Sequence, residues 1–143
     1  MIKIFKGIHR SIIIEFDEMG NCDILLMFNE LYEGKEYKLR VEFDMGLIQK
    51  KKKDERENII LICKQDNERD SVFKIQDENI VWVINQDDIE LGIERFSECK
   101  KDVFFSPAEF IQMSTPKNKK LDYVYCRLVQ NADFGVLSHI STF

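Results

Sequence analysis

Four acidic side chains recur at helical spacing in the second half of this 143-residue chain. Glu90, Glu94 and Glu98 follow one another at four-residue intervals, and Asp87 lies close to the same line. At about 100° per residue these carboxylates cluster about 135° away from the neighbouring apolar stripe, on the side that faces water. Two interpretations are open. The acids are an ordinary solvated helix face, or they form a binding ridge for a cationic partner.

Other residue types that could support catalysis lack the spacing that such chemistry needs. The two histidines, His9 and His139, belong to no His-x-x-x-His or His-Glu-x-x-His pattern. No serine lies in a Gly-x-Ser-x-Gly turn, and no glycine-rich loop is available to hold a phosphate group. The 26 acids could form a catalytic pair only where the fold brings two together, and nothing in the sequence selects a pair. We therefore predict no enzyme activity and no catalytic or cofactor-binding residues.

The cysteines are widely separated and include no Cys-x-x-Cys pair. This spacing predicts no metal site and favours reduced thiols in the cytoplasm, most of them small core residues: Cys22, Cys63, Cys99 and Cys126. The charged Lys3 and Lys6 interrupt the opening apolar stretch, so no signal peptide is predicted. No apolar run has the length that a membrane span requires.

Charge is distributed unevenly along the chain, whose formal net charge is -5. The segment from Asp54 to Glu98 contains 13 acidic and 5 basic residues, a net charge of -8, whereas the rest contains 13 acidic and 16 basic residues, a net charge of +3. An acidic middle segment disfavours nucleic acid as a ligand, because phosphates require compensating cations. It suits a basic protein partner.

One helix must position the four acids, and its signals extend from about residue 86 to residue 100. Ile89, Ile93 and Phe96 form a single apolar stripe, and Asn85 is a suitable N-cap. A second short helix is predicted from Ser106, because serine, proline and glutamate occupy the N-cap, N1 and N3 positions there. The alternative for residues 108–113 is an extended strand at a sheet edge.

The remaining elements are predicted to be strands. Period-two alternation from residue 37 to residue 45 indicates one buried and one solvated face. Short apolar runs predict further strands at residues 12–14, 24–28, 59–63, 72–75, 80–84 and 121–129. Trp82 is expected in the core, with a hydrogen-bond partner for its indole N–H. The element order predicts one α+β domain over residues 1–143, a mainly antiparallel β-sheet with the 86–100 helix packed on one face.

The stretch from Ile80 to Tyr125 combines a strand, a helix and a closing strand. Its hydrophobic order is Ile80-Val81-Trp82-Val83-Ile84-Asn85, then Ile89, Gly92, Ile93, Phe96 and Cys99, then Phe104-Phe105-Ser106-Pro107-Ala108-Glu109-Phe110, and last Tyr123-Val124-Tyr125. In this order the chain resembles small bacterial immunity proteins that are paired with toxins of contact-dependent growth inhibition and related polymorphic toxin systems. The resemblance implies a non-enzymatic inhibitor that binds one toxin domain, often a nuclease. It carries over no individual contact residue.

These observations lead to one functional hypothesis and its alternatives. The hypothesis is a cytoplasmic protein-binding domain that occludes the active site of a cognate, basic toxin domain through an acidic surface, without a cofactor. The predicted contact residues are Asp87, Glu90, Glu94 and Glu98, and no contact with membranes or nucleic acid is expected. The alternatives are a small-ligand-binding domain, an enzyme whose site is assembled by the fold, and a subunit of a homo-oligomer.

Overall fold

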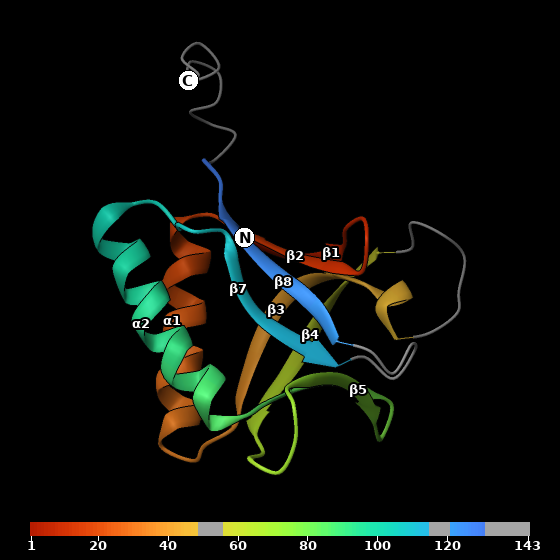
Figure 1. Ribbon diagram of the computed structural model, residues 1–143. Coiled ribbons are helices and arrows are strands. Elements are labelled where there is room, and N and C mark those ends of the chain that lie inside the picture. Colours follow the sequence, from red (N-terminus) through yellow and green to blue (C-terminus); the bar gives the residue numbers. More distant parts are fainter. Residues whose placement is uncertain (49–55, 115–120, 131–143) are drawn as a thin grey trace.

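The computed structural model describes residues 1–48, 56–114 and 121–130, and Figure 1 shows how the elements are arranged. In chain order they are β1 (Ile2–Lys6), β2 (Ser11–Phe16), α1 (Glu18–Tyr32), β3 (Tyr37–Asp44), the 3-10 helix η1 (Met45–Leu47), β4 (Arg56–Gln65), β5 (Val72–Gln76), β6 (Asn79–Ile84), α2 (Gln86–Asp102), β7 (Glu109–Ser114) and β8 (Leu121–Leu128). His139 lies outside the described residues. None of the helices within these ranges is long and apolar enough to cross a membrane.

The eight strands of the described residues close into a barrel in the order β1-β2-β8-β7-β5-β6-β4-β3, with β3 returning to β1. Antiparallel pairs, such as β3 with β4, alternate around the barrel with parallel pairs, such as β2 with β8. The prediction of a mainly antiparallel sheet is therefore wrong, since the strands close into a barrel and half of the strand pairs are parallel. Period-two alternation shows which side chains point inward, but it does not show which strand lies next to which.

Helix α1 replaces the strand predicted at residues 24–28, so the prediction of one main helix is also wrong. Asp17 caps this helix, because its carboxylate accepts a hydrogen bond of 2.8 Å from the Gly20 N–H. The buried apolar side chains have the i, i+3, i+4 and i+7 spacing of one helix face: Ile24, Met27, Phe28 and Leu31. Leu25 and Leu26 fill the gaps in that spacing, so the run of five apolar residues resembles a buried strand.

The short helix predicted from Ser106 is wrong as well. Helix α2 ends at Asp102, and Val103 takes the left-handed conformation with φ 57° and ψ 48°. Residues from Glu109 form β7, which pairs with β8 and buries Phe110 and Ile111. Strand pairing and the burial of these two side chains outweigh the local capping pattern. The alternative of a strand is confirmed, but its predicted place at a sheet edge is wrong, because β7 pairs with both β5 and β8 in the closed barrel.

Several other predictions are confirmed. Helix α2 covers the predicted 86–100 segment, and Asn85 is its N-cap. All four cysteines are free thiols, and only Cys22 is exposed. Trp82 is buried, with 1% of its surface exposed. The expected hydrogen bond of its indole N–H is not made, because Nε1 has no partner among the described residues.

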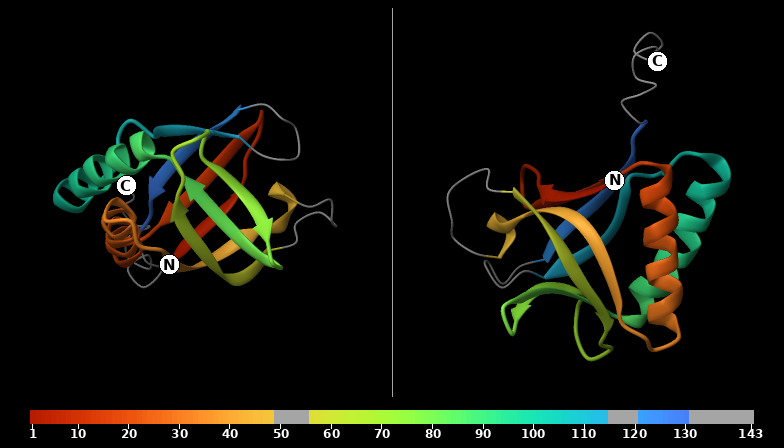
Figure 2. Two further views of the ribbon diagram at one scale, coloured as in Figure 1. Left: turned by 90° about the horizontal axis from the view of Figure 1, so that it is seen from below. Right: turned by 180° about the vertical axis from the view of Figure 1, so that it is seen from behind.

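The two helices pack side by side and antiparallel against one side of the barrel, as Figures 1 and 2 show. A connected set of aromatic rings joins them to the barrel interior. Phe43 and Phe73, on barrel strands, have ring centroids 5.1 Å apart, and Phe73 lies 5.3 Å from Trp82. Trp82 contacts Phe28 of α1 at 6.2 Å, and Phe28 contacts Phe96 of α2 at 5.7 Å. We call these five residues the aromatic core.

Gly92 sets the distance between the helices. A Cβ atom at this position would lie 2.6 Å from two ring atoms of Phe28 and 2.7 Å from a third. The Phe28 ring therefore lies directly on the backbone of α2, where only glycine leaves room for it. The conformational cost of an interior glycine, about 1 kcal/mol relative to alanine, is offset by this close packing.

We expect Gly92→Ala to lower the free energy of unfolding by about 1–2 kcal/mol, because an overpacking cost of up to about 3 kcal/mol exceeds the gain in helix propensity. Urea denaturation followed by the fluorescence of Trp82 measures this change. Ser97→Ala, on the exposed face of the same helix, is the control and should change stability by less than about 0.5 kcal/mol. An increase in stability on Gly92→Ala would contradict the assigned packing.

Candidate functional site

The four acids predicted from the sequence are all exposed on α2. Asp87 lies in the first turn, and Glu90, Glu94 and Glu98 lie on the turns that follow. Glu90 accepts a hydrogen bond of 3.0 Å from the Gln86 side-chain amide. The apolar stripe of the helix faces the opposite way, with Ile89 and Phe96 buried. The sequence therefore placed these side chains on the correct face.

The basic residue within this stretch of α2 does not neutralise the acids. The Arg95 guanidinium donates to the backbone carbonyl oxygens of Pro107 and Glu109 and lies 4.3 Å from the centre of the Phe105 ring. These contacts hold its charge against the segment that leads into β7. Among the described residues, the ion pairs involve Asp17, Glu15, Glu42, Glu30 and Glu33, and none involves the four acids.

The loop between β4 and β5 is attached to the N-terminus of α2. Gln86 donates its backbone N–H to the Asn67 side-chain oxygen at 2.7 Å, and the Gln65 amide donates to the Gln86 side chain at 3.0 Å. The Asn85 amide also reaches the backbone carbonyl of Arg69, at 3.5 Å. These bonds place the acids of the loop beside the first turn of the helix.

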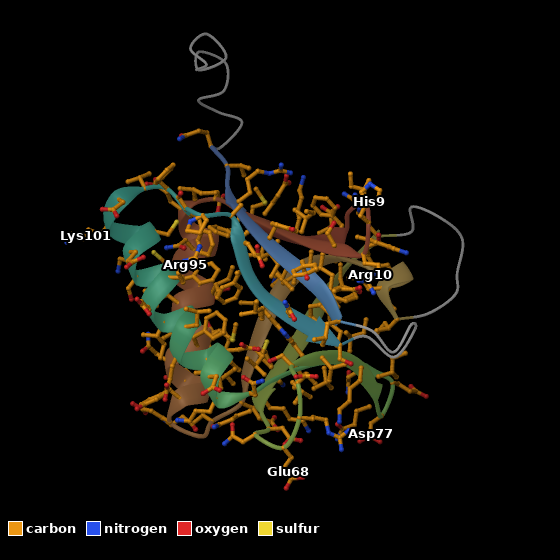
Figure 3. The ribbon with its side chains drawn as sticks, in the orientation of Figure 1. His9, Arg10, Glu68, Asp77, Arg95 and Lys101 are labelled. Atoms are coloured by element: carbon orange, nitrogen blue, oxygen red, sulfur yellow. The ribbon has the colours of Figure 1, made fainter. Side chains whose placement is uncertain are left out.

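We call the combined set of exposed and half-buried carboxylates the acidic surface: Asp66, Glu68, Asp70, Asp87, Glu90, Glu94 and Glu98. In Figure 3, Glu68 lies below the start of α2, whereas Asp77 lies on the separate turn between β5 and β6. The acidic segment from Asp54 to Glu98 includes both groups of acids, but nothing in the sequence indicates that the loop acids lie beside the helix. The Asn67–Gln86 bond, which spans nineteen residues, has no local signal in the sequence.

A partly buried polar contact lies at the N-terminus of α2, next to the acidic surface. Ser71, which is fully buried, donates its hydroxyl to the Asp88 carboxylate at 2.6 Å and accepts the Asn85 backbone N–H at 3.0 Å. Asn85 in turn accepts the Asp88 backbone N–H at 2.8 Å. Because the Ser71 hydroxyl is engaged on both sides and shielded from solvent, this arrangement suits the fixing of the helix N-terminus rather than nucleophilic attack.

Burial raises the pKa of Asp88 above its ordinary value of 3.8. The hydrogen bond from Ser71 opposes this shift, and the neighbouring charges of Asp87 and Asp70 add to it. The influence of Asp70 agrees with the position of the loop beside the helix. Negative charge is thus concentrated around the N-terminus of α2.

His9 does not belong to this site. His9 lies on the β1–β2 turn, far from Glu68 in Figure 3, and its φ is 51°. Over residues 1–48, 56–114 and 121–130, no group of three His, Cys, Asp or Glu side chains could hold a metal ion. Comparisons of the chain with protein-family models, curated proteins and solved structures gave no match.

The Asp88 carboxyl makes stability depend on pH. Its pKa is higher in the folded than in the unfolded chain, so its contribution to stability is greatest below about pH 4 and is lost as the pH rises through the folded pKa. Asp88→Asn keeps an acceptor for Ser71 and removes this dependence. We therefore expect Asp88→Asn to become more stable relative to the natural chain as the pH is raised from about 4 to about 7.

Urea denaturation at several pH values tests this expectation. Asp87→Asn, which removes a negative charge from the same turn without a buried hydrogen bond, is the matched control. If the stability difference between Asp88→Asn and the natural chain is constant over this pH range, burial does not raise the pKa of the Asp88 carboxyl.

Proposed function

We propose that this chain is an immunity protein: a non-enzymatic, cytoplasmic domain that binds a cognate toxin domain and occludes its active site. The acidic surface is the proposed contact region, and the partner is a basic protein domain, for which a nuclease is the best-fitting class. The observation that carries the proposal is that carboxylates from two separate segments of the chain are joined into one surface, and that none of them forms an ion pair with a base among the described residues.

Charge complementarity supports this choice of partner. A nuclease must present lysine and arginine side chains to the phosphates of its substrate. A protein that offers carboxylates at comparable positions competes for those cations, and the opposite charges speed encounter and exclude wrong partners. The exposed acids of α2 and of the β4–β5 loop provide such a field on one end of the molecule.

The rigidity of the acidic surface also favours binding. Its carboxylates are carried by a helix whose apolar face is buried, and the adjoining loop is held by hydrogen bonds from Gln86 and Asn85. Little backbone entropy would be lost on association, so the cost of ordering the interface is small. Repulsion among the acids, about 0.2–0.5 kcal/mol for each pair four residues apart, would be relieved by a cationic partner.

A co-expression assay tests the proposed activity. The partner used is the C-terminal domain of the protein encoded immediately upstream, produced with and without this chain. We expect growth to stop when that domain is expressed alone and to resume when the chain is present, and the two proteins to purify together. Absence of both rescue and co-purification would contradict the proposal.

Charge reversal tests the contact surface separately. With Glu90→Lys and Glu94→Lys combined, we expect the association rate at low salt to fall by about tenfold or more, because electrostatic steering is lost. The effect should shrink above about 0.3 M salt, where the charges are screened. Stopped-flow or surface plasmon resonance measurements across a salt series give these rates.

The matched control reverses two acids that are exposed on the barrel, Glu57→Lys and Glu78→Lys. It changes the net charge by the same amount but leaves α2 intact, so the association rate should fall by less than about threefold. An equal or larger loss in this control would place the contact surface on the barrel instead.

A further inference from the structure

A cavity lies between the two helices, at the end opposite to the N-terminus of α2. Its volume is about 220 Å³, and its lining residues are Glu18, Asn21 and Cys22 of α1, Cys99 and Lys100 of α2, and Leu128 of β8. Asn21 and Cys99 are buried, whereas Glu18, Cys22 and Lys100 are exposed. The cavity therefore has a buried inner wall and a charged, accessible rim.

Asn21 contributes an unused hydrogen-bond acceptor. Only 2% of its surface is exposed, and its side-chain NH2 donates to the Phe96 carbonyl oxygen at 3.1 Å. That bond fixes the orientation of the amide, because the carbonyl of Phe96 requires a donor. The Asn21 Oδ1 atom has no partner among the described residues. A buried acceptor that makes no hydrogen bond destabilises the folded state. A hydrogen-bond donor bound in the adjoining cavity would remove this cost.

The rest of the inner wall is apolar. Burial raises the pKa of the Cys99 thiol, although a hydrogen bond with the Phe104 backbone opposes the shift. The thiol is therefore protonated at neutral pH and behaves as a small hydrophobic group. A buried water typically makes about three hydrogen bonds, but the buried side chains here offer it one strong partner. A cavity of about 150 Å³ with apolar walls can hold benzene, so this one accommodates a substituted ring.

We propose that this cavity binds a small neutral molecule with an apolar ring and one hydrogen-bond donor, of the class of phenols and indoles, with the donor bonded to Asn21 Oδ1. Leu128 and the Cys99 thiol contact the ring, and the Cys22 side chain stands at the entrance. This binding site is separate from the acidic surface, and its existence does not depend on the proposed inhibition of a toxin.

Two probes of similar size distinguish a polar site from a plain void. Phenol carries the donor, and toluene has a methyl group in its place. In titrations followed by amide chemical shifts of the full chain, we expect phenol to bind about tenfold more tightly than toluene, with shifts at residues 18–22 and 99–100. Equal or tighter binding of toluene, or no saturable shift with either probe because the cavity holds only water, would overturn the proposal.

Variants at the entrance locate the binding. Cys22→Trp fills the mouth of the cavity and should weaken phenol binding by about tenfold or more, whereas Cys22→Ser should leave it unchanged within about twofold. Because a bulky variant can perturb folding, the natural chain provides a second readout: phenol should slow the alkylation of Cys22, the exposed thiol, by N-ethylmaleimide. Alkylation at the same rate with and without saturating phenol would show that the probe binds elsewhere.

Discussion

The contact of the Phe28 ring with the backbone of α2 at Gly92 is the interaction on which the rest of the structure depends. It brings the two helices close enough for Phe28 to touch both Trp82 of the barrel and Phe96 of α2. The position of α2 then follows, and with it the direction in which the acids face. A larger residue at Gly92 would move the helix away from the barrel and reduce the burial that stabilises both.

A second, polar set of contacts fixes α2 at its N-terminus. Ser71 bridges the Asp88 carboxylate and the Asn85 backbone, and Gln86 binds Asn67 of the neighbouring loop. These bonds satisfy backbone N–H groups that a helix start leaves without partners. They also hold like charges near one another, which costs stability. A surface that keeps such repulsion is suited to a cationic partner, which is the basis of the proposed function.

The sequence predicted the parts of the fold that local patterns determine. Helix α2, its cap at Asn85 and the exposure of Glu90 and its neighbours follow from periodicity and capping chemistry. Barrel closure was missed because it depends on pairs between distant strands, such as β2 with β8, that leave no local signal. Helix α1 was missed because Leu25 and Leu26 conceal its period. Two further features arise only from tertiary packing. One is the attachment of the β4–β5 loop to α2, and the other is the position of Asn21 and Cys99 in the lining of the same cavity.

The central claim is that the acidic surface is the face that the partner covers. Carboxyl footprinting tests it most directly: exposed acids are coupled to glycine ethyl ester by a carbodiimide, with and without the upstream-encoded toxin domain, and the labelled sites are found by mass spectrometry. The account predicts protection of Glu68, Asp87, Glu90 and Glu94 in the complex, with labelling of Glu57 unchanged. Protection of Glu57 while the acids of α2 stay fully labelled would contradict it.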